Sequence, residues 1–323
     1  MLCLPQKKER IIHLENDSKI FVAFKRSFTQ QLDKLVLRIL SRGMAGANEH
    51  VAPGPSLAEV LDQTRVNRRK TILYNLVAPG QHRIWLETPF GEIRCLVKVR
   101  LAPLPSAPLL LFHHGFAEIP YTSTWKQLLP PSTPFPAHTV AVQAPYHNSY
   151  REPFASGFSS TQHIYQMFAG SLRIYELLQE QFEANRAAFT VASGLSWGGI
   201  TSLLYEGFFR RARATIPMFA SPNLALVMTD GADLIGRTLP MSRTEMDALF
   251  NFTPVCDQGD KERIFPVMGE DDLFFRFERH AMVYSPERLL AVPSAHVAAV
   301  RRTRRQIRRH VLDVLDWAAR NPR

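Results

Sequence analysis

The stretch FTVASGLSWGGITSLLY, residues 189–205, changes character at its middle. Its first half is a short apolar run typical of a strand, and its second half has apolar residues at helical spacing. The bend between the halves holds Gly194, Ser196 and Gly198. A serine at such a bend serves either as a helix N-cap or as the exposed serine of a tight G-x-S-x-G turn, whose glycines let strand and helix approach closely. The apolar run before the bend and the helical pattern after it favour the second interpretation.

Bulk properties indicate an ordinary globular protein. The chain has 323 residues, of which 46% are hydrophobic, and can form one large domain or two small ones. No apolar stretch approaches the roughly 18 residues that a membrane-spanning helix needs, and the charged residues 7–10 follow the first apolar residues, unlike the order in a signal peptide. Cys3, Cys95 and Cys256 are too few and too scattered for a disulfide framework or a zinc site. We therefore expect a cytoplasmic protein.

The net charge of +10 comes mainly from two basic amphipathic segments. The C-terminal segment 301–320 predicts a helix with an apolar stripe and a solvated arginine face. In the segment 25–42, apolar residues recur at helical spacing beside lysines and arginines; such a helix packs on the domain or makes peripheral contact with a membrane surface. Nucleic acid is not an expected partner, because the arginine run lacks interleaved aromatic residues or a recognisable module. The oligomeric state is not predicted.

The pattern along the chain predicts a helical extension and linker over residues 1–58 and a main domain over 59–323. Residues 41–56 are rich in glycine, alanine and proline, as linkers are. Residues 83–100 resemble a hairpin, and short continuous apolar runs typical of buried strands follow at 108–116, 138–147, 188–196, 214–222, 263–272 and 288–296. Helical patterns lie between several of these runs. The alternation predicts an α/β fold with a mostly parallel sheet flanked by helices.

Reactive side chains follow three of the predicted strands. Ser196 follows one, Glu270, Asp271 and Asp272 follow another, and His296 follows the last. Loops at the carboxyl ends of parallel strands meet at one edge of the sheet. A serine hydroxyl needs a base to take its proton, and a histidine base needs a carboxylate to orient it. The sequence thus supplies a serine, an acid and a histidine for nucleophilic catalysis.

This order of serine, acid and histidine resembles the α/β-hydrolase superfamily over about residues 70–320. The matching motifs are GLSWGG at 194–199 as the nucleophile elbow, VMGEDDLFF at 267–275 as the acid loop, SAH at 294–296 as the histidine loop and HHGF at 113–116 as the oxyanion turn. The resemblance implies the α/β-hydrolase fold and the catalytic residues Ser196, Asp272 and His296. It implies no metal and no organic cofactor.

The choice of acid follows the superfamily's usual G-x-x-D spacing, counted from Gly269 to Asp272. Asp271 is the near alternative. Asp230 is a more remote one, because some superfamily members place the acid after the preceding strand.

The resemblance also implies an oxyanion hole and substrate contacts. The backbone N–H groups of Phe116 and Trp197 are expected to form the oxyanion hole. His114, His147 and Arg151 are candidate substrate-binding residues, the last two from the stretch PYHNSYR. For His147 the alternative is an imidazole satisfied by loop carbonyls.

The segment 223–262 follows the sixth predicted strand and is longer than an ordinary connection. It is either a lid-like insertion, as the resemblance implies, or a set of helices packed on the sheet. The residues expected to line an apolar acyl pocket are Leu224, Leu226, Met228, Leu234, Leu239, Met241, Met246, Leu249 and Phe250.

We expect a serine hydrolase that cleaves a small-molecule carboxylic ester through an acyl-enzyme intermediate, with thioesters and amides as close variants. Two alternatives remain open. One is an acyltransferase that uses the same three residues. The other is a non-catalytic α/β-hydrolase scaffold that binds a membrane or an acidic partner.

Overall fold

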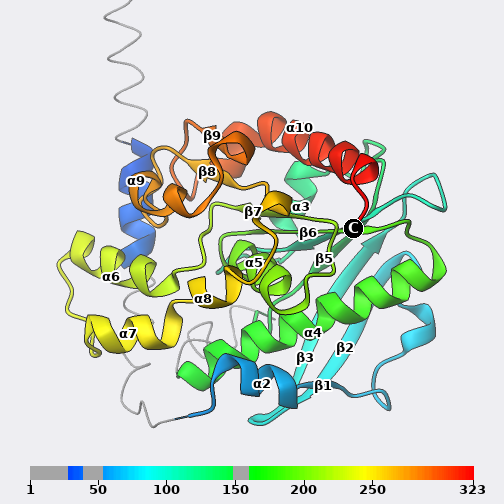
Figure 1. Ribbon diagram of the computed structural model, residues 1–323, viewed down its shortest axis with the longest axis horizontal. Coiled ribbons are helices and arrows are strands. Elements are labelled where there is room, and N and C mark those ends of the chain that lie inside the picture. Colours follow the sequence, from blue (N-terminus) through cyan, green and yellow to red (C-terminus); the bar gives the residue numbers. More distant parts are fainter. Residues whose placement is uncertain (1–27, 39–53, 148–159) are drawn as a thin grey trace, which may run out of the picture.

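A single mixed sheet organises the molecule, shown as a computed structural model in Figure 1. The structure describes residues 28–38, 54–147 and 160–323. In these ranges the sheet has nine strands, in the order β1-β2-β3-β5-β4-β6-β7-β8-β9. The strands are β1 (Arg65–Val66), β2 (Gly80–Thr88), β3 (Gly91–Arg100), β4 (Leu109–His113), β5 (His138–Val142), β6 (Thr190–Leu195), β7 (Ala214–Met218), β8 (Val267–Gly269) and β9 (Leu290–Val292).

Pairing is antiparallel at one side of the sheet and parallel over the rest. β1, β2 and β3 pair in antiparallel fashion, and β3 joins the remaining sheet by an antiparallel pairing with β5. From β5 to β9 every pairing is parallel. The expected hairpin is present, with Thr88 opposite Gly91 at its turn. β1 was not predicted, because two residues are too few to show a periodic pattern.

Helices cover both faces of the sheet, as expected for parallel strands. An unlabelled helix, which we call the N-terminal helix, spans residues 28–38. The others are α2 (Leu57–Gln63), α3 (Ser123–Leu128), α4 (Thr161–Asn185), α5 (Trp197–Phe209), α6 (Leu224–Ile235), α7 (Arg243–Phe250), α8 (Thr253–Cys256), α9 (Phe277–His280) and α10 (Ala299–Arg320). Short 3-10 turns lie at η1 (Leu73–Asn75), η3 (Lys261–Arg263), η4 (Ala281–Val283) and η5 (Pro286–Arg288).

Two hydrophobic cores lie on opposite faces of the sheet. In β4, Leu109 and Leu111 belong to the core beneath α4 and α5, whereas Leu110 and Phe112 belong to the core beneath α3 and α10. Successive side chains of a strand point to opposite faces, so a strand buried on both faces is apolar throughout. This sandwich confirms the predicted α/β architecture and holds the carboxyl ends of β6, β8 and β9 at a common edge.

The N-terminal helix buries a different face from the one that its apolar residues predict. Thr29, Asp33 and Leu37, spaced four residues apart, are buried, whereas Phe28 and Leu35 are 64% and 52% exposed. The presence of a helix agrees with the prediction for the segment 25–42, and only the buried face differs. Its orientation is set by Asp33, whose carboxylate accepts hydrogen bonds from the main domain. Membrane contact by this segment stays a prediction.

The segment 223–262 forms α6, α7 and α8 after β7. The prediction placed it after the sixth strand, and the structure places it after the seventh, because β1 was not predicted. α6 and α7 pack against each other beside the edge of the sheet.

The expected linker at 41–56 falls mostly outside the described residues, and α2 begins at Leu57 with a Ser56–Glu59 capping box. The division into extension and domain stays a prediction. Among the described helices, none is both long and apolar enough to cross a membrane.

Candidate active site

Ser196 stands at the sharp bend between β6 and α5. Its backbone has φ 53° and ψ −113°, a conformation that side-chain-bearing residues rarely adopt and that costs about 1 to 3 kcal/mol. Its N–H donates to the carbonyl of Met218 on the neighbouring strand at 2.7 Å, which anchors the bend to the sheet. The bend therefore presents Ser196 beyond the carboxyl end of β6.

The flanking glycines are required by close backbone approach. A Cβ atom on Gly194 would lie 2.1 Å from the carbonyl oxygen of Gly198, and one on Gly198 would lie 2.2 Å from the carbonyl oxygen of His113. Both contacts involve backbone atoms, which cannot move away without disturbing the packed strands. In the turn GLSWG the two glycines are therefore needed for close approach of the strand and the helix, as the G-x-S-x-G pattern predicted.

Three side chains that are distant in the sequence form one hydrogen-bonded chain. The Ser196 Oγ lies 3.0 Å from His296 Nε2, and His296 Nδ1 lies 2.7 Å from Asp272 Oδ2. A carboxylate only accepts, so the imidazole carries its proton on Nδ1 and leaves Nε2 to accept from the serine hydroxyl. The structure thus brings together the three residues that the resemblance selected.

Asp272 is the carboxylate that meets the histidine. Its side chain is fully buried, and its second oxygen, Oδ1, accepts from the N–H groups of Phe274 at 2.7 Å and Phe275 at 2.9 Å. The alternative Asp230 instead pairs with Arg279. Asp271 is joined through its backbone N–H to Ser294. Of the three candidates, Asp272 has the geometry of the orienting acid.

The environment of His296 favours its charged form. Burial lowers the pKa of the imidazole, but the charge of Asp272 and its hydrogen bond outweigh burial, so that the pKa is raised above the usual value. Asp33 adds to this effect. The ring is stacked on Phe274, with centroids 4.5 Å apart, and its side chain is only 12% exposed. The imidazole therefore takes up a proton more readily than a free one and is largely shielded from solvent.

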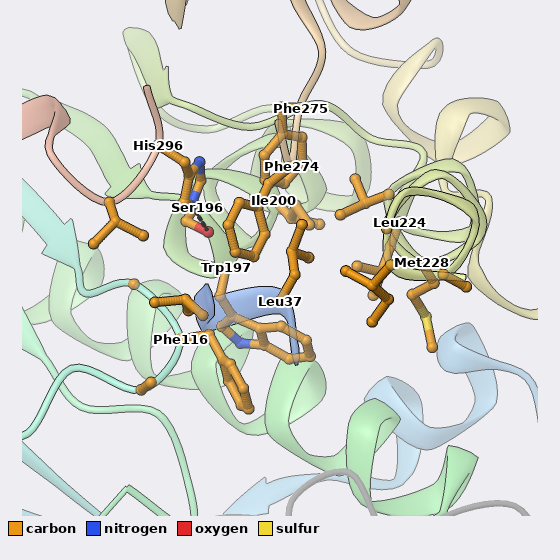
Figure 2. Close-up of a pocket in the computed structure, with 18 of the residues that line it drawn as sticks. Leu37, Phe116, Ser196, Trp197, Ile200, Leu224, Met228, Phe274, Phe275 and His296 are labelled. Atoms are coloured by element: carbon orange, nitrogen blue, oxygen red, sulfur yellow. Dashed lines mark hydrogen bonds between the residues drawn. The ribbon is translucent and has the colours of Figure 1, made fainter. Parts of the chain in front are cut away.

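The turn that follows β4, the strand paired with β6, lines the same cavity as Ser196. Phe116 and Trp197 line one cavity together with Ser196 (Figure 2), and their ring centroids are 6.1 Å apart. The carboxylate of Glu118 accepts from the N–H groups of Gly115 at 3.3 Å and Thr124 at 2.5 Å, which fixes the turn. Burial raises the pKa of Glu118 to about 7, and these hydrogen bonds oppose the rise. Sequence reasoning missed Glu118, because its role depends on a turn that no local pattern announces.

The candidate substrate-binding histidines do not reach the cavity in this structure. His114 is fully buried, with Nδ1 bonded to the Gly115 carbonyl at 2.6 Å and Nε2 accepting from Ala144 N–H at 2.8 Å. His147 is buried, with Nδ1 2.9 Å from the Pro145 carbonyl, as its loop-carbonyl alternative expected. Arg151 lies outside the described residues.

A large apolar cavity begins at Ser196. Its volume is about 800 Å³, within the range of small-molecule sites. Figure 2 shows Ser196 and His296 at one side and Leu224 and Met228 of α6 at the other, with Leu37 of the N-terminal helix between them. Of the nine residues predicted to line an acyl pocket, those that do so are Leu224, Met228, Leu239 and Met246. The remaining five, which do not line it, are Leu226, Leu234, Met241, Leu249 and Phe250.

The N-terminal helix belongs to this site, which the sequence did not predict. Val36 and Leu37 line the cavity, and Asp33 reaches the loops that carry Asp272 and His296. The only local signal was an acidic residue in the middle of a basic amphipathic helix. Such a residue is usually solvated.

Comparison with known proteins agrees with this architecture. No family model matches the sequence, and no curated protein matches it. Among solved structures, a hyperthermophilic esterase from the archaeon Pyrobaculum calidifontis is similar with a TM-score of 0.51 and 14% identity, over 91% of this chain and 98% of that one. The acylaminoacyl peptidase of Pyrococcus horikoshii is similar with a TM-score of 0.50 and 14% identity, over 72% of this chain and 40% of that one. The chain therefore has the α/β-hydrolase fold, and the predicted fold class is confirmed.

Proposed function

We propose that this protein is a serine hydrolase that cleaves carboxylic esters with an apolar acyl group. The observation that carries the proposal is the hydrogen-bonded chain Ser196–His296–Asp272 at one end of an apolar cavity. A serine held in a strained turn, with both a base and an orienting acid in reach, is the arrangement that nucleophilic catalysis requires.

Acylation begins with attack of the Ser196 Oγ on the ester carbonyl carbon. His296 Nε2 takes the hydroxyl proton, while Asp272 accepts the Nδ1–H and stabilises the imidazolium. The backbone N–H groups of Phe116 and Trp197 are the proposed donors to the tetrahedral oxyanion. When the intermediate collapses, the C–O bond of the ester breaks, and His296 returns the proton to the departing alcohol.

Deacylation repeats these steps with water. His296 takes a proton from a water molecule that attacks the acyl carbon, and the Ser196 Oγ leaves with that proton. Thioesters and amides enter the same cycle with a thiol or an amine as leaving group. An alcohol in place of water gives acyl transfer.

The cavity supports an apolar acyl group as substrate. Its lining beyond Ser196 is mainly aliphatic and aromatic, and burying each methylene group contributes about 0.8 kcal/mol. We therefore expect kcat/KM to rise by up to about fourfold per added methylene until the chain fills the cavity. The segment 223–262, which supplies much of this lining, acts as a lid in this proposal.

The test is turnover of p-nitrophenyl esters with acyl chains from about two to about twelve carbons, a range that the cavity size suggests. Ser196→Ala should abolish turnover and leave the melting temperature nearly unchanged. The matched control is Ser202→Ala, which removes a buried hydroxyl on α5 that bonds to the Gly199 carbonyl and should retain activity.

Turnover that survives in Ser196→Ala contradicts the proposal. Absence of turnover and of labelling by a fluorophosphonate in the folded wild type would favour the non-catalytic scaffold. Faster product formation when an alcohol is added would favour the acyltransferase.

A further inference from the structure

The carboxylate of Asp33 is buried between the two loops that carry the acid and the base. It is fully shielded from solvent, and it lies on the face of the N-terminal helix that contacts the main domain. Its Oδ2 accepts from the N–H of His296 at 3.0 Å and the N–H of Leu273 at 3.2 Å. Its Oδ1 accepts from the N–H of Val297 at 3.0 Å.

These hydrogen bonds join residues that are 240 to 264 positions apart in the sequence. Leu273 directly follows Asp272, so one bond holds the acid loop. The other two bonds hold the backbone of His296 itself and of its neighbour. One carboxylate thus fixes both loops relative to each other and to the N-terminal helix.

The same carboxylate faces the charged groups of the site. The charges with the largest effect on His296 are those of Asp272 and Asp33, and the charges with the largest effect on Asp33 are those of His296 and Asp272. Burial raises the pKa of Asp33, and proximity to His296 together with the N–H donors opposes the rise. Burying a carboxylate is costly, and three N–H donors offset that cost only while both loops keep this geometry.

We propose that Asp33 is a positioning residue for the proposed reaction: it holds the loops of His296 and Asp272 in register and adds a second negative charge beside the imidazole. The inference rests on the proposed function. Catalytic groups must be held within about 0.5 Å of their productive geometry, and a displacement of about 1 Å can cost about a hundredfold in rate. The N-terminal helix is thereby part of the active site.

Two substitutions remove the charge together with part or all of the hydrogen bonds. Asp33→Asn removes the charge and keeps one acceptor oxygen, but its NH2 group cannot accept from the N–H that faces the other oxygen. Asp33→Ala removes the charge and both acceptors. We expect kcat to fall by about tenfold in Asp33→Asn and by about a hundredfold in Asp33→Ala, with little change in KM for a short ester. The matched control is Leu35→Ala, an exposed position on the same helix, which should leave kcat unchanged.

The pH profile distinguishes positioning from a merely structural role. Loss of the Asp33 charge lowers the pKa of His296, so the acidic limb of kcat/KM should move to lower pH in Asp33→Asn. Simple destabilisation would reduce the active fraction without moving this limb. Amide hydrogen exchange of the wild type tests the contacts even where a variant does not fold. We expect slow exchange at the N–H groups of Leu273, His296 and Val297, which donate to Asp33.

A wild-type kcat and an unmoved acidic limb in folded Asp33→Asn would overturn this inference and leave the proposed function standing. Rapid exchange of all three amides in the wild type would also overturn it. A wild type with neither turnover nor labelling would overturn both proposals, because there would be no catalysis to position.

Discussion

Buried histidines lie on both sides of Ser196, and their environments drive their protonation in opposite directions. His296 lies against the carboxylates of Asp272 and Asp33, and its pKa is raised. His113 and His147 are held by burial and backbone carbonyls, and the pKa of each is lowered to about 4. Burial alone disfavours an imidazolium, whereas a buried carboxylate partner more than compensates for burial. Burial therefore does not identify the candidate base; the carboxylate partner does.

The largest expected effect is on the base itself. His296→Gln should lower kcat by about a millionfold, because the loss of one member of such a unit costs nearly as much as the loss of all. His147→Gln should keep activity within about tenfold, since its ring contacts Phe116 rather than the cavity. Ester turnover in folded variants measures both. Equal losses of kcat in the two variants would contradict the assignment of His296, and not His147, as the base.

The second effect concerns the carboxylate. Asp272→Asn should lower kcat by about ten thousandfold, because an amide no longer enforces the required tautomer or stabilises the imidazolium. Asp271→Asn is the matched control and should change kcat by less than about threefold. If the ranking of the two variants were reversed, the acid would have to be reassigned by one residue.

A third prediction concerns how the free energy of unfolding depends on pH. The lowered pKa of His147, about 4 against about 6.5 in the unfolded chain, stabilises the fold fully above the unfolded value. This contribution, up to about 3 kcal/mol, is lost as the pH falls from about 6.5 towards 4. The raised pKa of His296 acts in the opposite sense: its contribution is present below the unfolded value and is lost as the pH rises through the folded value.

Melting temperatures measured from about pH 7 to about pH 4 should therefore fall less steeply in His147→Gln than in the wild type. His82→Gln, at a partly exposed ring that bonds to the Ala78 carbonyl, serves as the control. Parallel curves for the wild type and His147→Gln would show that this imidazole does not carry the expected penalty.

The smallest effect is on the pH dependence of the wild type. Only neutral His296 acts as a base, so kcat/KM should rise with pH to a plateau, with its midpoint above the ordinary imidazole value of about 6.5. A midpoint well below that value would mean that burial outweighs Asp272.

The order of Ser196, Asp272 and His296 was predictable because its evidence is local. Ser196, Asp272 and His296 each follow a short apolar run, and strand-end loops of a parallel sheet converge whatever the details of packing. Gly194 and Gly198 could be interpreted in the same way, since the close approach they permit is a property of one turn.

The contribution of Asp33 was not predictable from local patterns. Amphipathic spacing correctly predicted a helix, but two of the apolar residues that made up this spacing, Phe28 and Leu35, are exposed. The buried face of this helix is set by hydrogen bonds from backbone N–H groups about 240 or more positions away. The hydrophobic periodicity of a segment contains no information on such a distant partner. Glu118 was missed for a related reason: the N–H groups that it accepts from become available only when the turn after β4 is formed.

The most direct test of the central claim is the rate of fluorophosphonate labelling across pH, with the modified residue located by peptide mapping. We expect one labelled residue, Ser196, a labelling rate that rises with pH through a single ionisation whose midpoint lies above the ordinary imidazole pKa, and loss of labelling in His296→Gln. Labelling at another residue, or at Ser196 with a rate that neither pH nor His296→Gln alters, would contradict it.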